Sequence, residues 1–364
     1  MEDHLTSSSA QTQLYCIPDT LIRWPWPART SLHVDKIKAI LNTSFKKYPQ
    51  IERKALKMLE QCEIAFFVCC VYPGLDEAQL DVTAIFCIIG WLVDEIITES
   101  IDHVQTTSDI IMDALRDPSK SRPLEEHIIG EITRQWWLQA IREMTPVSLQ
   151  RLFHAVEDWL LACVQQSSVV FSSEKETIEK FLERRSSDVA MSICMVLLEM
   201  NVDIPQRVWE HPILETVRSL MCHIVSLDNV RMLCSTTLFQ NGSNRQNVQD
   251  MFSYNREQAN GDYHNFIHVV MSNQQLNLEE AYKWANQRHQ DLQKKYMETL
   301  ARMPSWGAEI DAQVEKYIGG LGRMISGNVK YSISCLRYAD GRKEVGDRDN
   351  RVFELLPSSK PTRV

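Results

Sequence analysis

The spacing of apolar residues is the feature that most restricts the fold. Over most of the 364 residues, apolar side chains recur at intervals of three and four. This spacing places them on one face of an α-helix. Strand-like alternation is weak throughout, and the chain has only 12 Gly and 13 Pro. The pattern predicts an all-α protein and disfavours alternating strands and helices.

The expected helices follow one another without a linker or a repeat, and Pro73-Gly74 marks a turn. We expect one domain over residues 14–340, between a disordered N-terminus (1–13) and a flexible tail (341–364). A helical bundle around a central apolar cavity is the natural architecture. The expected helices are Leu32–Met58, Cys62–Val71, Gln79–Ile101, Leu124–Met144, Pro146–Gln165, Lys175–Met200, Pro212–Leu227, Asp250–Ala259, Asp262–Ser272, Leu278–Ala301 and Ile310–Leu336.

Charge and cysteine usage restrict the partners and the compartment. A formal net charge of -9 argues against nucleic-acid binding, which needs concentrated Lys and Arg. Most of the ten cysteines stand in apolar stretches, so we expect reduced core thiols. The longest uncharged apolar stretch, Val82–Val93, is too short to span a bilayer, and no secretory signal is visible. The expectation is a soluble, cytoplasmic protein with no stable membrane insertion.

Two acids, Asp94 and Glu95, directly follow the uncharged stretch that ends at Val93. On a helix, Trp91 and Cys87 lie one and two turns before Asp94 on nearly the same face. A carboxylate would therefore lie above an aromatic side chain. Mg²⁺ prefers such hard oxygen donors, although acids at a helix end are more often simply solvated. Asp94 is the stronger candidate ligand.

Three segments together resemble the motifs of class I terpene synthases. They are Trp91–Glu99, Asp250–Glu257 and Tyr331–Tyr338, and their order and rough spacing also match. The resemblance spans about residues 16 to 340 and implies a single-domain bundle that ionises a prenyl diphosphate. It implies Mg²⁺, as three ions, with Asp94 and Glu95 among the ligands.

The family's second metal motif carries Asn, Ser and Glu at positions i, i+4 and i+8, which place three oxygen donors on one helix face. Ser253 and Glu257 fit it, but Gln249 stands at the Asn position. Asn229 stands 20 residues earlier, at the end of an expected helix. Without residues 230–249, Asn229 would precede Asp250 and the motif would be complete. The resemblance then implies Asn229, Ser253 and Glu257 as metal ligands.

We therefore interpret residues 230–249 as a retained intron. The segment corresponds to 60 nucleotides, so its removal keeps the reading frame, and it lacks a clear apolar period. A Val codon begins with GT, and a Gln codon can end with AG, which are the bases of splice donors and acceptors. A genuine surface loop is the alternative, and either form would disturb a metal site.

The resemblance also implies residues that bind the diphosphate group. Arg supplies a planar fork of donors for phosphate oxygens, and a Tyr hydroxyl adds another. An Arg, an acid and an effector position further upstream match the family's diphosphate sensor. The implied binding residues are Arg185, Arg256, Arg337 and Tyr338, and Arg185, Asp188, Val189 and Asp94 are implied in catalysis.

The implied reaction releases diphosphate and leaves a carbocation, which an apolar, aromatic cavity must shield from water. The candidate lining residues are Phe66, Phe67, Phe86, Trp91 and Tyr331, each of which can equally be ordinary core. The N-terminal segment Ile22–Arg29 either folds over this cavity or packs a loop against the bundle. Chain length resembles that of fungal sesquiterpene synthases of secondary metabolism, which favours farnesyl diphosphate and a cyclic hydrocarbon or alcohol.

Two other functions remain open at this point. One is a catalytically impaired homologue or a helical binding protein, because residues 230–249 interrupt the second motif. The other is a prenyl diphosphate synthase, which shares the bundle but carries two Asp-rich motifs. The product, its stereochemistry and the oligomeric state do not follow from the sequence.

Overall fold

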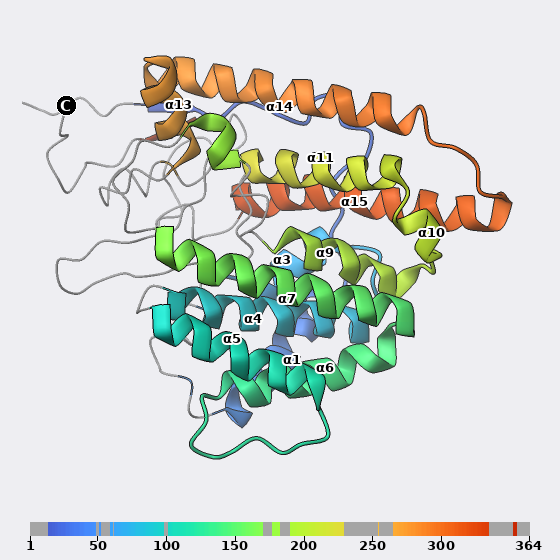
Figure 1. Cartoon of the computed structure of the whole chain (residues 1–364). Coiled ribbons are helices and arrows are strands. Elements are labelled where there is room, and N and C mark those ends of the chain that lie inside the picture. The colour runs from blue at the N-terminus through green and yellow to red at the C-terminus, as the bar shows by residue number, and fades with distance from the viewer. Residues whose placement is uncertain are drawn as a thin grey trace, which may run out of the picture.

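The computed structural model describes residues 14–48, 51, 59–60, 62–97, 101–169, 177–182, 190–228, 254, 265–334 and 352–354. This part of the chain is a bundle of α-helices (Figure 1). The helices are α1 (Val34–Lys47), α3 (Ile64–Val71), α4 (Glu77–Ile97), α5 (Ile101–Arg116), α6 (Ile129–Glu143), α7 (Pro146–Val169), α9 (Met191–Leu197), the 3-10 helix η1 (Leu198–Asn201), α10 (Gln206–Trp209), α11 (Pro212–Asp228), α13 (Phe266–Gln274), α14 (Leu278–Leu300) and α15 (Ala308–Ser334). The all-α prediction is confirmed.

One small antiparallel sheet accompanies the helices. Strand β1 (Leu14–Cys16) pairs with β2 (Val352–Glu354), and Leu14 lies opposite Glu354. Three residues give too short a pattern for alternation to show, so the sequence predicted neither strand. β2 falls within the segment that we expected to be a flexible tail.

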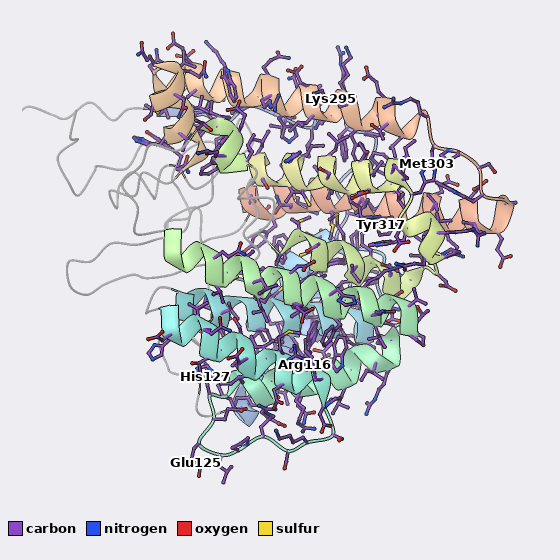
Figure 2. All side chains as sticks on the ribbon, in the orientation of Figure 1. Arg116, Glu125, His127, Lys295, Met303 and Tyr317 are labelled. Atoms are coloured by element: carbon purple, nitrogen blue, oxygen red, sulfur yellow. The ribbon has the colours of Figure 1, made fainter. Side chains whose placement is uncertain are left out.

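Helix α5 was not expected from the sequence. Its buried residues Val104, Ile111 and Leu115 keep a helical spacing, but the polar run from Gln105 to Asp109 interrupts the apolar pattern. The helix expected from Leu124 begins only at Ile129, after an exposed loop that contains Glu125 and His127 (Figure 2). The helix expected over Asp250–Ala259 lies almost wholly outside the described residues.

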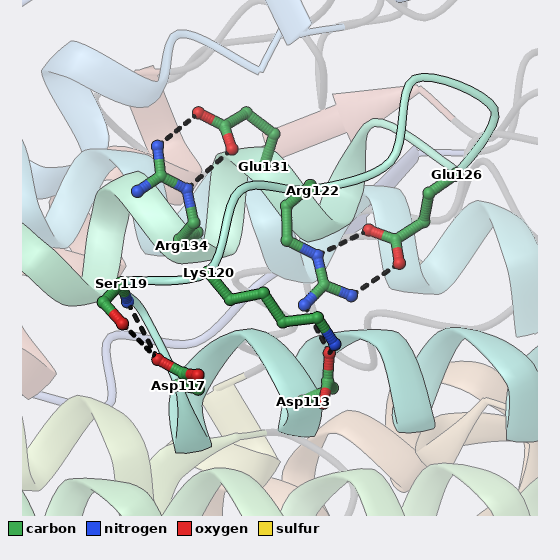
Figure 3. Close-up of polar contacts among 8 residues, drawn as sticks. All are labelled: Asp113, Asp117, Ser119, Lys120, Arg122, Glu126, Glu131 and Arg134. Atoms are coloured by element: carbon green, nitrogen blue, oxygen red, sulfur yellow. Dashed lines mark hydrogen bonds and ion pairs between the residues drawn. The ribbon is translucent and has the colours of Figure 1, made fainter.

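Arg122 holds the loop between α5 and α6 in place (Figure 3). Its guanidinium donates from Nε and Nη2 to the two carboxylate oxygens of Glu126, at 2.7 and 2.5 Å. It also donates from Nη1 to Asp113 on α5. The Arg122 side chain is only 5% exposed. Its bidentate ion pair with Glu126 is therefore largely shielded from water.

The long helix α15 packs closely on α3 because a side chain is missing at their crossing. A Cβ at Gly327 would lie 1.9 Å from the carbonyl oxygen of Cys70. Beside it, Tyr331 donates a 2.7 Å hydrogen bond to the carbonyl of Cys62. A glycine and a hydrogen bond together therefore hold the two helices in close contact.

The N-terminal segment lies along α14 and α15. The indole of Trp24 donates a 2.8 Å hydrogen bond to the carbonyl of Gly322, and its ring lies 5.4 Å from that of Tyr296. Trp26 covers Gly322, where a Cβ would lie 2.2 Å from the indole ring. This is the packing of a loop against the bundle, the second of the two expectations for Ile22–Arg29.

Seven of the eight cysteines among the described residues are buried, and no disulfide joins any two of these eight. Burial raises the pKa of the Cys69 thiol to about 12, with neighbouring Cys70 adding to the shift. These observations agree with the expected core thiols. No helix in the described ranges is long and apolar enough to cross a membrane.

Candidate functional site

Helices α4, α7, α11 and α15 all end on the same side of the bundle (Figure 1, left). Their last residues are Ile97, Val169, Asp228 and Ser334. The first metal segment expected from the sequence includes the end of α4, and Asn229 of the second directly follows α11 in the sequence. Segments that are more than a hundred residues apart are therefore brought to one end of the molecule.

Helix α4 has two distinct buried faces. Phe86 lies 5.4 Å from Trp136 and 5.9 Å from Trp159 in ring centroids, so it faces α6 and α7. Cys87 and Trp91 are each 1% exposed and lie on a different face. Cys87 is close enough to Tyr72 to contribute to the raised pKa of its hydroxyl, which burial causes. The face that carries Trp91 therefore turns toward the bundle's interior.

The acidic pair stands at the end of the same helix. Asp94 and Glu95 stand in the last turn of α4, and Asp94 follows Trp91 by three residues. Their side chains lie outside the described residues, so their role as metal ligands stays a prediction.

Helix α11 presents an equivalent face. Cys222 and Val225 are buried and stand three residues apart on one face of the helix. Position 229 follows Val225 by four residues. Burial raises the pKa of the Cys222 thiol to about 12, and Arg218 opposes this shift. Asn229 is the first residue after α11 and lies outside the described residues. If the helical path continued by one residue, Asn229 would share the face of Cys222 and Val225.

Neutral groups occupy the interior below these helix ends. Tyr72 donates a 3.2 Å hydrogen bond to the carbonyl of Cys194. Burial raises the pKa of Cys194 to about 12 and holds the pKa of Tyr317 well above its ordinary value. Tyr317 lies toward the α10 end of α15 (Figure 2). These thiols and hydroxyls are therefore uncharged at neutral pH.

Below this neutral layer, at the end of the bundle opposite the site, lies a charged cluster that the sequence did not reveal. Arg151 on α7 pairs with Glu199 on η1, and the carboxylate is 1% exposed. Trp209 lies between two guanidinium groups, with Arg218 4.0 Å and Arg151 4.5 Å from its ring centroid. Arg151 and Arg218 stand on different helices, each within an otherwise apolar pattern. No sequence pattern relates them, and only the fold brings them together.

The predicted lining residues divide into two groups. Phe66 and Phe67 lie 6.2 and 4.9 Å from Tyr331 in ring centroids, so these three rings cluster between α3 and α15. Trp91 lies on the inward face of α4. Phe86 packs against Trp136 and Trp159, between α4, α6 and α7. The cavity-lining role of all five residues stays a prediction.

A small pocket of about 60 Å³ lies elsewhere, between α1, α4 and α6. Tyr48, Ile88 and Gln139 are among its lining residues. Sites that enclose an organic ligand measure about 300 Å³ or more. This pocket is therefore too small for a prenyl diphosphate.

The remaining predicted site residues lie outside the described part of the chain, as does the segment 230–249. They are Arg185, Asp188, Val189, Asn229, Ser253, Arg256, Glu257, Arg337 and Tyr338. Among the described side chains, no group of three or more His, Cys, Asp or Glu could hold a metal ion. The metal-binding and diphosphate-binding roles of these residues therefore stay predictions.

Known proteins resemble this chain in both sequence and fold. A Delta(6)-protoilludene synthase of Postia placenta is 30% identical over 357 residues, which cover 97% of this chain and 95% of that protein. A Delta(6)-protoilludene synthase of Stereum hirsutum is 29% identical over 355 residues, which cover 96% and 95%. The crystal structure of an α-eudesmol synthase has a TM-score of 0.69 at 14% identity, covering 85% of this chain and 97% of that chain.

Residues 86–295 match the family model described as "Terpene synthase family 2, C-terminal metal binding". The match begins in α4 and includes both segments that we interpreted as metal motifs. The family resemblance predicted from these motifs is thereby confirmed: the chain belongs to the terpene synthase family.

Proposed function

We propose that this protein is a sesquiterpene synthase that ionises farnesyl diphosphate and cyclises the resulting carbocation. The observation that carries this proposal is the similarity to named protoilludene synthases over nearly the whole chain. The common end of α4, α11 and α15 supports it, because the acidic pair in α4 and the end of α11 lie on that side. The cytoplasmic location belongs to the same proposal.

The donor chemistry fits a magnesium site. Asp94, Glu95, Asn229, Ser253 and Glu257 all offer oxygen atoms, which Mg²⁺ prefers. When bound, Mg²⁺ would neutralise the charge that develops on the departing diphosphate. The family implies a divalent metal, and we propose that three Mg²⁺ ions are used.

Cationic side chains would complete the diphosphate site. Arg185, Arg256 and Arg337 offer fixed positive charge, and Tyr338 offers a hydroxyl donor. Such groups stabilise a leaving anion most strongly where water is excluded. Asp188 and Val189 would connect the sensing Arg185 to the substrate.

The described groups Trp91, Tyr72 and Cys194 are apolar or neutral, which suits a carbocation. Trp91 and the rings of Phe67 and Tyr331 offer aromatic faces. The raised pKa values of Tyr72 and Cys194 keep a phenolate or thiolate from trapping the cation. Deprotonation or water addition would end the reaction.

Residues 230–249 decide whether the chain as written is active. We propose that they are absent from the mature protein, which would join Asn229 to Asp250. A messenger RNA that encodes Val230–Gln249 throughout would contradict this. Sequencing the transcript across the region tests it directly.

The activity test compares the full chain with a chain that lacks residues 230–249. Each is incubated with farnesyl diphosphate and Mg²⁺, and both diphosphate release and volatile products are measured. We expect the shortened chain to be at least about tenfold more active, because a misplaced metal ligand costs preorganisation. Geranyl and geranylgeranyl diphosphate serve as substrates of other chain length.

Two variants make the test specific to the site. Asp94→Asn in the shortened chain removes one carboxylate and should lower diphosphate release by about 100-fold or more. Asp102→Asn, on the exposed start of α5, is the matched control and should leave the rate unchanged. No diphosphate release from either chain would favour an impaired homologue or a binding protein, and a longer prenyl diphosphate as product would indicate a prenyl diphosphate synthase.

A further inference from the structure

Two polar side chains near the end of α15 each have a buried atom without a hydrogen-bond partner, as does Tyr317 earlier on the helix. Asn328 is 3% exposed and Ser332 is 2% exposed, and the amide nitrogen of Asn328 and the hydroxyl of Ser332 are both unbonded. Ser326 on the same helix behaves differently, because its hydroxyl donates to the carbonyl of Arg323 at 3.3 Å. A helical serine often satisfies itself on the preceding turn in this way. Ser332 does not.

The two residues share one face of α15. They are four residues apart, which places their Cβ atoms about 6 Å from each other. Gly327 and Tyr331 mark the face that packs on α3, and Gly322 marks the face covered by Trp26. At about 100° per residue, Asn328 and Ser332 lie on neither face but continue the line of Tyr317 and Leu321.

That line runs through the interior toward the side where the helices end. Tyr317 lies in the neutral layer below, near Tyr72 and Arg218. Asn328 and Ser332 are three and four turns further along α15. Two of the other helices that end on the same side carry a comparable group, since the indole nitrogen of Trp91 on α4 and the hydroxyl of Ser226 on α11 are also buried and unbonded.

Buried polar atoms without partners are costly, and in folded proteins most find a protein group or a water molecule. A buried water needs two to four polar partners. The amide nitrogen of Asn328 can donate a hydrogen bond, and the hydroxyl of Ser332 can donate or accept one. One water molecule could reach both groups. An apolar interior gains nothing from two such groups unless something polar is bound between them.

We propose that Asn328 and Ser332 bind one water molecule at the wall of the substrate chamber, and that this water determines the product. The proposal rests on the proposed synthase function. A fixed dipole beside the apolar chain favours positive charge at the nearest carbons and disfavours it elsewhere. The pair would therefore select among competing carbocations without taking part in ionisation.

The first test measures products in the chain lacking residues 230–249. Asn328→Leu and Ser332→Ala each remove one partner of the water, the first with a similarly branched but larger side chain and the second with little change in volume. We expect the share of the main terpene product to fall at least twofold, while diphosphate release stays within about threefold of the parent. Ser326→Ala is the matched control and should leave both readouts unchanged. An unchanged product distribution in both variants would overturn the proposal.

The second test needs no activity, so it separates this proposal from the proposed function. A shared water couples its partners, so the double variant should unfold at nearly the same urea concentration as the less stable single variant. Groups that are merely unpartnered would make each single replacement neutral or stabilising, with additive effects. That outcome would contradict the water site even if no substrate were turned over.

Discussion

At the scale of single residues, the most constrained charge is Glu199. Its carboxylate accepts from Arg151 and from the hydroxyl of Ser148, and it is 1% exposed. Burial raises its pKa from 4.5 to about 7, although Arg151, Ser148 and Arg218 oppose the shift. The cluster lies at the base of the bundle, on the side opposite the helix ends, so its role is to hold α7, η1 and α11 together.

The raised pKa of Glu199 makes stability depend on pH. The folded state binds the proton more tightly than the unfolded state, so the extra stability is complete below about pH 4.5 and is lost as pH rises through about 7. We expect unfolding in urea to show a loss of about 2 kcal/mol between pH 5 and pH 8 from this group. Glu199→Gln should remove that component. Parallel pH profiles of the two proteins would contradict the assignment.

At the scale of elements, close contact between α15 and α3 depends on Gly327. The Cβ of an alanine would meet the backbone of Cys70, which cannot rotate away. Gly327→Ala should therefore push the helices apart and cost about 3 kcal/mol or more, measured by urea unfolding. Gly74→Ala is the control, since nothing lies within 4 Å of its Cβ position. Equal stability of the two variants would show that α15 can shift without cost.

The connection between α5 and α6 depends on Arg122. Arg122→Ala would leave the Glu126 side chain, which is 13% exposed, without its partner. Loss of one member of a buried pair costs about 3 kcal/mol. Lys120→Ala removes an exposed contact to Asp113 and should cost less than about 1 kcal/mol. Thermal unfolding of the two variants checks this, and a small effect of Arg122→Ala would mean that the loop is held by other contacts.

The sequence predicted elements where one face was continuously apolar. Cys62–Val71 and Leu278–Ala301 match α3 and α14 within two residues. The polar run in α5 interrupts the apolar pattern, so the sequence did not indicate this helix. In α4, the apolar periodicity did not distinguish the two buried faces of the helix. Phe86 and Trp91 look alike in the sequence, yet Phe86 packs against Trp136 and Trp159 while Trp91 lies on a different buried face of α4.

At the scale of the whole molecule, the motif order predicted the family, which the family model and the relatives confirm. The spacing of residues within one helix fixes a face, so Asp94 could be related to Trp91 and Cys87 before the fold was known. The Arg151 and Glu199 cluster and the pair Asn328 and Ser332 could not be predicted in this way. The contacts of these residues depend on which helices lie next to each other in the fold. A local sequence pattern does not contain that information.

The pairing of Leu14–Cys16 with Val352–Glu354 has a practical use. Because the strands are antiparallel, residue 14 lies opposite residue 354. A short peptide could join these positions, and new termini could be opened between α14 and α15, where Ser305 and Gly307 are exposed. Such a circularly permuted protein would retain every described helix intact, and a fluorescent label at the new ends would stand on the side opposite to the last residues of α4 and α11 (Figure 1).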